Sequence, residues 1–252
     1  MVVLYSKSEI EKIKEASLVV KEVFKQLKNY IKPGISTKDV DKLVEDVIYS
    51  MSAIPSSKGY YGFPGSCCTS VNNVVVHGIP DDKTILKDGD IISVDVVANK
   101  NGFHSDACRT FPVGKISAEA ERLIKVTKEA FFKGVEFAKV GNRISDISHA
   151  IQTHVEAAGF GVVREYQGHG VGRSMHEEPS IPNYGRPNRG FRLKSGAVLA
   201  IEPMVTYGNY SVKVLADKWT AVTVDNSIAA HYENTVVVTN DEPLILTIED
   251  EA

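Results

Sequence analysis

The sequence is poor in cysteine and lacks any long apolar segment. Its three cysteines, Cys67, Cys68 and Cys108, form no CxxC pair, and this spacing suits neither a disulfide framework nor a zinc ribbon. There is no run of 18 apolar residues and no secretory signal pattern. We therefore expect a cytoplasmic protein, in a reducing compartment, without a membrane segment.

The sequence also lacks an excess of charge of either sign. Lysine and arginine together number 29, aspartate and glutamate 32, and the formal net charge is −3. This balance argues against a protein that binds nucleic acid or an anionic membrane. Of the 252 residues 43% are hydrophobic, so the chain can bury a sizeable core as one large domain or two small ones.

Two stretches share a pattern, a Leu-Lys-x-Gly turn followed by an apolar run that ends on a carboxylate. They are LKDGDIISVD at 86–95 and, 107 positions later, LKSGAVLAIE at 193–202. The same offset relates Gly34 to Gly141, Asp39 to Asp146, and Val40 to Ile147. We interpret this as an internal repeat of approximately residues 8–115 and 116–240. No linker-like segment separates the halves, so we expect one domain over residues 1–252.

Hydrophobic periodicity predicts four helices and several strands. Ser6 and Glu9 fit a capping box at the start of the first helix. Helices are expected from Ser6 to Pro33, from Ser36 or Thr37 to about Met51, from Ser117 to about Phe137, and over 144–157. Strands are expected at 71–76, 90–98, 103–112, 161–166, 197–207, 211–215, 220–224 and 233–238. Two helices followed by strands, twice in succession, indicate an α+β fold with antiparallel sheet and helices on one side.

Each half carries two acidic residues at matching positions. The tripeptide His104-Ser-Asp106 is repeated as His231-Tyr-Glu233, 127 positions later. With the two strand-end acids, four carboxylates should converge near a pseudo-twofold axis, and unpaired buried carboxylates are unfavourable without cations. Four carboxylates and one imidazole suit Mn, Fe, Co or Zn in a paired site. The candidate ligands are Asp95, Asp106, His169, Glu202 and Glu233.

A glycine-rich segment, QGHGVGRSMHEEP at 167–179, contains His169 and His176. Its glycines allow the backbone to approach a ligand closely. A phosphate-binding loop is the alternative, but the GxxxxGKS pattern and its lysine are missing, which favours a metal or acyl site. His77 follows an apolar run and precedes a turn, so it is either a buried core histidine or part of the site.

Six motifs follow one another along nearly the whole chain. They are NNVVVHGIP at 72–80, DGDIISVDV at 88–96, GFHSDACRTF at 102–111, GHGVGRSMHEEP at 168–179, LAIEPM at 199–204 and AAHYENTVVVT at 229–239. Together they resemble the type I methionine aminopeptidases of bacteria. The resemblance implies the pita-bread fold, two pseudo-twofold halves with a curved antiparallel sheet and helices on its outer face. It also implies a metal-dependent hydrolase that removes N-terminal methionine when the second residue is small.

The resemblance further implies a dinuclear site with two divalent ions. Asp106 and Glu233 would bridge the ions, Asp95 would bind one, and His169 with Glu202 would bind the other. The same ligands accept several metals, so Co, Mn, Fe, Zn and Ni all remain candidates.

A mechanism follows from the chemistry of these residues. Because two ions lower the pKa of bound water, hydroxide becomes available near neutral pH, with Glu202 as proton acceptor. His176 would donate to the scissile carbonyl as it becomes an oxyanion. His77 would contact the scissile nitrogen and help the leaving amine take its proton.

The resemblance also implies a mostly apolar pocket for the methionine side chain, which suits an unbranched thioether. Its lining would be Tyr60, Phe63, Cys68, His77, Met175 and Trp219, with His176 beside the bond that is cleaved. The implied partners are the N-termini of nascent polypeptides near the ribosome exit. We expect a monomer, with neither a nucleic-acid nor a membrane partner.

The remaining histidines and cysteines have simpler interpretations. His149 and His154 are expected on a helix, in a solvated or structural role. His104 and His231 flank proposed ligands, so they could hydrogen-bond those ligands without binding the metal. Cys67 and Cys108 are expected to be small buried residues.

Two alternative functions remain at this stage. A peptidase that cleaves before proline would keep the fold and the metals, but such enzymes carry an additional N-terminal domain and this chain reaches its first motif too early to hold one. A binding module of the same fold would need no metal, whereas all five ligands are present here.

Overall fold

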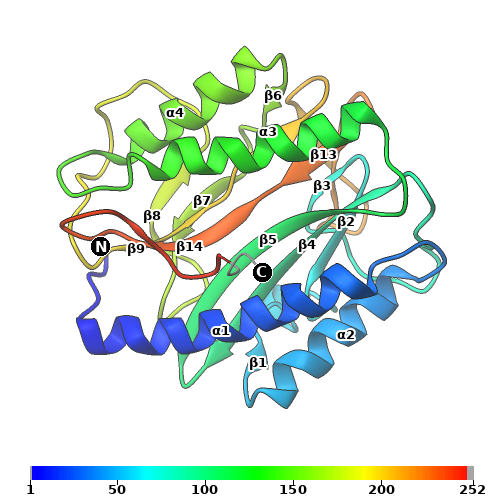
Figure 1. The fold of residues 1–252 in the computed structure, drawn as a ribbon, viewed down its shortest axis with the longest axis horizontal. Coiled ribbons are helices and arrows are strands. Elements are labelled where there is room, and N and C mark those ends of the chain that lie inside the picture. Colours follow the sequence, from blue (N-terminus) through cyan, green and yellow to red (C-terminus); the bar gives the residue numbers. More distant parts are fainter. Residues whose placement is uncertain (1, 249–252) are drawn as a thin grey trace.

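In this computed structural model, which describes residues 2–248, four helices form two pairs (Figure 1). They are α1 (Lys7–Tyr30), α2 (Thr37–Ser50), α3 (Ala118–Val135) and α4 (Ile144–Ala157). The backbone N–H of Ser6 donates to the Glu9 carboxylate at 2.9 Å, as the capping box predicts. All four predicted helices are thus confirmed. Within residues 2–248, none of them combines the length and apolar character needed to cross a membrane.

The strands form one large antiparallel sheet and two small ones. The large sheet runs in the order β1 (Ile54–Pro55), β4 (Ile91–Lys100), β5 (Phe103–Pro112), β14 (Glu233–Val237), β9 (Val198–Ile201), β7 (Gln167–Gly170) and β8 (Glu177–Pro182). Two further strands extend this sheet: β2 (Cys68–Val71) pairs with β4, and β15 (Leu244–Ile245) pairs with β14. One small sheet joins β13 (Ala229–His231), β10 (Met204–Thr206) and β6 (Gly161–Val162), and the other joins β11 (Val212–Val214), β12 (Ala221–Thr223) and β3 (Val74–Val76). A 3-10 turn covers Tyr60–Gly62.

The two helix pairs cover one face of the large sheet (Figure 1). On β4, Ile92, Val94 and Val96 belong to the apolar core that includes residues of α1 and α2. The alternate residues Asp95 and Val97 point to the opposite face, where they line a cavity. The predicted α+β fold with helices on one side of an antiparallel sheet is therefore confirmed, and the face away from the helices is available for a site.

Turns at equivalent positions of the two halves have the same backbone geometry. Gly34 and Gly141 both have φ of 95°, and each is the donor of a backbone hydrogen bond, to Leu86 O at 2.8 Å and Leu193 O at 3.2 Å. This left-handed conformation favours glycine. The 107-residue spacing therefore relates two like turns, and the division of the chain near residue 115 stays a prediction.

The predicted strand over 71–76 is wrong as one element. Asn72 has φ of 53°, a left-handed value that asparagine tolerates better than most residues. The chain turns there, so β2 ends at Val71 in the large sheet and β3 begins at Val74 in a small one.

The predicted strand over 197–207 is likewise two strands in different sheets. Pro203 interrupts the run because it has no backbone N–H for strand pairing, and Glu202 lies at the break between β9 and β10. The strand expected over 161–166 is confined to Gly161–Val162. Short strands that the periodicity did not indicate are β1, β7, β8, β13 and β15.

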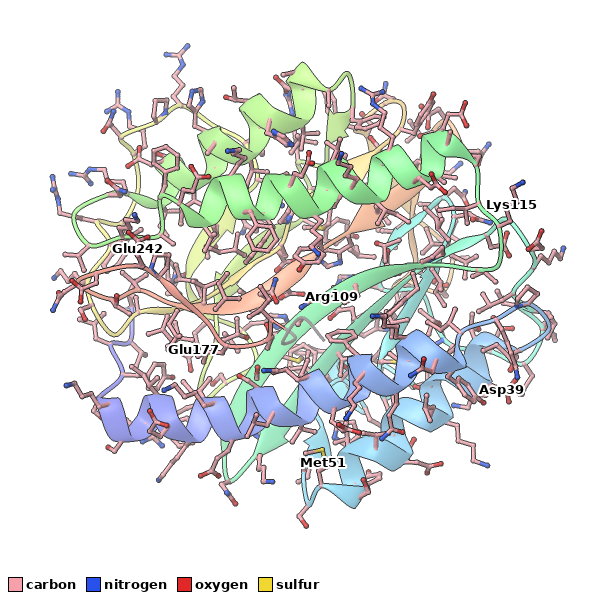
Figure 2. The ribbon with its side chains drawn as sticks, viewed as in Figure 1. Asp39, Met51, Arg109, Lys115, Glu177 and Glu242 are labelled. Carbon is pink, nitrogen blue, oxygen red and sulfur yellow. The ribbon has the colours of Figure 1, made fainter. Side chains whose placement is uncertain are left out.

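Arg109 of β5 lies between the two helix pairs (Figure 2). Its guanidinium carbon is 5.0 Å from the ring centroid of Phe24 in α1 and 4.4 Å from that of Tyr232. Among residues 2–248 the same group donates to four oxygens, namely the backbone carbonyls of Cys108, Glu233 and Thr247 and the side chain of Asn234. One buried cation thereby joins β5 and β14, which pair near the middle of the large sheet.

Candidate functional site

A cavity of about 670 Å³ opens on the sheet face away from the helices. Its lining contains every residue that the sequence suggested for catalysis, substrate binding or metal binding. These residues are Tyr60, Phe63, Cys68, His77, Asp95, Asp106, His169, Met175, His176, Glu202, Trp219 and Glu233. Segments that are far apart in the chain thus meet at one place.

Strand register brings three of the carboxylates together. Asp95 pairs with Cys108 across β4 and β5, and Cys108 pairs with Glu233 across β5 and β14, so the three side chains share one face. Asp106 is two residues from Cys108 and points to the same face. Thr235 holds Asp106 in place, since its hydroxyl accepts from the Asp106 N–H at 2.9 Å and donates to the Asp106 carbonyl at 2.8 Å.

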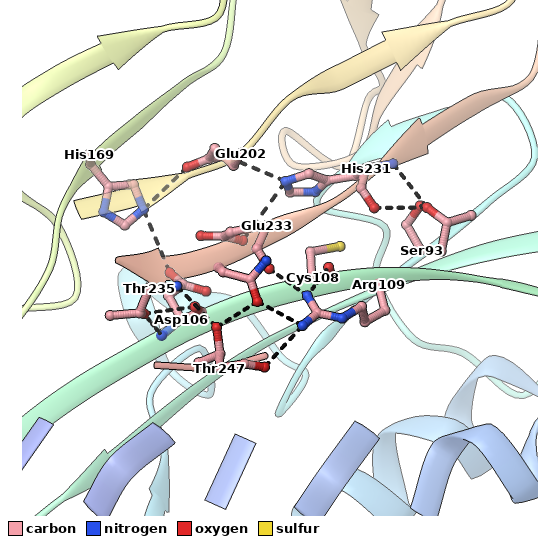
Figure 3. A network of polar contacts seen from close by, with 12 residues as sticks. Ser93, Asp106, Cys108, Arg109, His169, Glu202, His231, Glu233, Thr235 and Thr247 are labelled. Atoms are coloured by element: carbon pink, nitrogen blue, oxygen red, sulfur yellow. Dashed lines mark hydrogen bonds and ion pairs between the residues drawn. The ribbon is translucent and has the colours of Figure 1, made fainter. Parts of the chain in front are cut away.

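Two imidazoles flank the carboxylate of Glu202 (Figure 3). His169 Nε2 lies 3.5 Å from Glu202 Oε1 and 3.6 Å from Asp106 Oδ2. On the other side, His231 Nε2 lies 3.7 Å from Glu202 Oε2 and 3.8 Å from Glu233 Oε2. Two sets of ligand atoms therefore converge, one from Asp106, His169 and Glu233 and one from Glu202, His231 and Glu233.

Burial makes the charged forms of these side chains unfavourable when no cation compensates them. It raises the pKa of Asp95 to about 6, and burial together with the neighbouring carboxylates raises the pKa values of Asp106, Glu202 and Glu233 well above their usual range. Burial also lowers the pKa of His169 to about 3, so this ring is neutral and able to bind a cation.

Several of these oxygens have no hydrogen-bond partner among residues 2–248. They are Asp95 Oδ1, Asp106 Oδ1 and Glu233 Oε1, all buried. Buried polar atoms are normally paired, so these oxygens are available to bind a cation. Carboxylate oxygens with an imidazole nitrogen are the donors that divalent transition metals accept, so the residues fit such ions.

His77 and His176 occupy the wall of the cavity next to this cluster. His77 has φ of 58°, and its ring meets those of Tyr166 and Trp219 edge-on, with centroid distances of 5.2 and 6.1 Å. Burial lowers the pKa of His77 to about 4. The ring of His176 lies 4.4 Å from that of His169, and its Nδ1 is 2.9 Å from the Tyr60 hydroxyl.

The chain matches the model of Metallopeptidase family M24 over residues 11–240. The methionine aminopeptidase of Clostridium acetobutylicum is 56% identical over 248 residues, which are 98% of this chain and 99% of that protein. The chain belongs to metallopeptidase family M24. Within it, the chain belongs with the methionine aminopeptidases.

Two solved structures are similar to this chain, one in sequence and fold and one in fold alone. The crystal structure of methionine aminopeptidase from Thermotoga maritima has a TM-score of 0.97 and 44% identity, and the match covers 99% of this chain and 100% of that one. Prolidase from Pyrococcus furiosus has a TM-score of 0.79 at 23% identity, over 99% of this chain and 66% of the prolidase, so it shares the fold alone. This M24 metallopeptidase therefore has the expected pita-bread fold.

The other histidines and the cysteines of the M24 chain lie in ordinary surroundings, with one exception. His104 Nδ1 is 3.0 Å from Gly172 O, His149 is exposed, and His154 contacts Glu129 at 3.2 Å. Cys67 and Cys108 are buried, as expected. The exception is His231, which lines the cavity beside the proposed ligands. Its position two residues before Glu233 was the only signal in the sequence.

Proposed function

We propose that this M24 metallopeptidase uses two divalent ions to remove N-terminal methionine from peptides whose second residue is small. The observation that supports it most strongly is the junction, within one cavity, of an apolar wall and a buried cluster of carboxylates and imidazoles. A hydrolase for an apolar N-terminal residue needs both parts side by side.

Five residues would hold the ions. Their ligands would be the carboxylates of Asp95, Asp106, Glu202 and Glu233 and the imidazole of His169. When bound, divalent ions lower the pKa of water and polarise a carbonyl oxygen. The carboxylates would then be ionised, because the cations compensate the burial that now raises their pKa values.

The protein groups around the ions would carry the proton transfers. Glu202 would accept a proton from the attacking water, since it lies on the cavity wall among the ligands. When the Tyr60 hydroxyl donates to Nδ1 of His176, the proton of the neutral ring lies on Nε2, which can donate to the developing oxyanion. His77 would contact the scissile nitrogen.

The apolar wall would select the methionine side chain. Phe63 and Trp219 pack edge-on at 5.2 Å, and Met175 and Cys68 add polarisable sulfur to the lining of the same cavity. Such a pocket suits an unbranched thioether. The fixed size of the cavity would also restrict the residue that follows the methionine in the peptide. The substrates would be the N-termini of nascent chains. The enzyme would be a monomer and would act in the cytoplasm, near the ribosome exit.

A peptide panel tests this proposal. With Co, Mn or Fe present, the enzyme should release methionine from Met-Ala-Ser, and norleucine in place of methionine should be tolerated. N-terminal lysine, aspartate or glycine, an acetylated amine, or a bulky second residue should prevent cleavage. Equal kcat/KM on Ala-Pro-Ser would identify a proline-directed peptidase instead, and no hydrolysis with any metal would favour a binding module.

A further inference from the structure

His231 is a buried polar side chain with an unused ring nitrogen. It is 2% exposed, and its Nε2 has no hydrogen-bond partner among residues 2–248. Thr110 fixes its backbone, since the Thr110 hydroxyl accepts from the His231 N–H at 3.0 Å and donates to the His231 carbonyl at 2.9 Å. The ring is thus held at the end of β13 with Nε2 directed at two carboxylates (Figure 3).

The distances from this nitrogen do not fit hydrogen bonds. His231 Nε2 is 3.7 Å from Glu202 Oε2 and 3.8 Å from Glu233 Oε2, and hydrogen bonds of this kind are shorter than about 3.2 Å. Two ligand atoms that are each about 2.0 to 2.2 Å from a shared ion lie about 3 to 4 Å apart. The separations around His231 are of that size.

The arrangement on the opposite side of Glu202 is closely similar. His169 Nε2 lies 3.5 Å from Glu202 Oε1 and 3.6 Å from Asp106 Oδ2. Each imidazole thus faces one oxygen of Glu202 and one oxygen of a further carboxylate. By these distances, His231 Nε2 is placed as well as His169 Nε2 to bind a metal ion.

We propose that His231 is a sixth protein ligand, which gives one of the two ions an imidazole nitrogen in addition to the oxygens of Glu202 and Glu233. The inference rests on the proposed dinuclear site and deepens it. Both imidazoles, His169 and His231, would then serve the ion that Glu202 binds. A second nitrogen favours Co, Ni, Zn and Fe over Mn and Mg, which prefer oxygen.

Cobalt bound to the full-length protein provides the test. X-ray absorption at the cobalt edge counts coordinated imidazoles, and isothermal titration gives the number and affinity of the ions. We expect two imidazoles per chain in the native protein and one in His231→Gln. The variant should also lose roughly 10 to 100-fold in affinity for one Co ion, and less for Mn, with a changed visible absorption of the Co form.

A matched control is His104→Gln, because His104 precedes Asp106 by the same two residues but contacts Gly172 O. It should keep both imidazoles and both affinities. One imidazole per chain in the native protein, or an unchanged count in His231→Gln, would overturn the proposal even if affinity falls, since a residue that only hydrogen-bonds a ligand can also weaken binding. If the native protein binds two Co ions and cleaves Met-Ala-Ser, such a result leaves the proposed function standing. Absence of any bound Co would overturn both.

Discussion

The Tyr60 hydroxyl lies 2.9 Å from Nδ1 of His176, and the two rings meet edge-on with centroids 5.3 Å apart. Tyr60 comes from the 3-10 turn that follows the first helix pair, and His176 from the glycine-rich segment of the second half. A contact between distant parts of the chain thus sets the orientation of the ring that we place next to the scissile carbonyl. The neighbouring Tyr61, 85% exposed, has no comparable contact with His176 in the described structure.

Replacing His176 by alanine should lower kcat by roughly 10² to 10³, the effect of losing one oxyanion donor. Metal content should stay unchanged, because His176 is not among the proposed ligands. Steady-state kinetics on Met-Ala-Ser and elemental analysis of the purified variant measure the two quantities. A protein without metal would show that His176 is a ligand.

Replacing Tyr60 by phenylalanine should lower kcat about fivefold with little change in metal affinity, since one neutral hydrogen bond contributes about 1 kcal/mol. Tyr61→Phe is the matched control and should behave like the native enzyme. Equal kinetics of Tyr60→Phe and Tyr61→Phe would argue that the Tyr60 hydroxyl does not position His176.

Removal of the ions should abolish activity and reduce stability. Without cations, four buried carboxylates face one another, and ions that bind only the folded state stabilise it by about 2.7 kcal/mol at 100 times Kd. Exhaustive chelation should therefore lower Tm, and Co, Mn or Fe should restore turnover. Full activity at a metal content near zero would contradict the metal-dependent mechanism.

Trp219→Ala should raise KM for Met-Ala-Ser and weaken discrimination against N-terminal leucine. Trp219 packs against Phe63 and His77 at centroid distances of 5.2 and 6.1 Å, so its loss widens the apolar end of the cavity. Tyr49→Ala, on the outer surface of α2, is the control. Unchanged kcat/KM ratios for methionine over leucine would place the specificity pocket elsewhere.

Arg109→Met should destabilise the protein by about 3 kcal/mol or more. The substitution keeps the apolar stem but leaves buried acceptors such as Glu233 O and Asn234 Oδ1 without this donor. Urea unfolding, followed by circular dichroism, measures the change, and Arg186→Met on the exposed loop should have an effect within about 0.5 kcal/mol. Equal stability of the two variants would show that the central strands do not depend on Arg109.

The helices and the proposed ligands could be predicted because both depend on short sequence patterns. Ser6 and Ser117 precede the first and third helices, and Pro33 follows the first, so caps and breakers gave four helices close to the observed bounds. The proposed ligands were also readable, since acids at the ends of apolar strands recur in both halves and the motifs around them resemble one family.

The short strands could not be predicted, because their stability comes from neighbours. β7 has four residues, two of them glycine, and it is a strand because it pairs with β8 on one side and β9 on the other. The same holds for the division of 71–76 and 197–207, where the two parts of one apolar run find partners in different sheets.

By itself the sequence determined the helices, the residue types of the site and the family. Only the tertiary structure decided which atoms face one another. Register across β4, β5 and β14 puts Asp95 and Glu233 on either side of Cys108, and the break at Pro203 places Glu202 between His169 and His231. A histidine in an apolar strand has the same local pattern whether it fills the core or faces a carboxylate, because the pattern does not record what lies across the sheet.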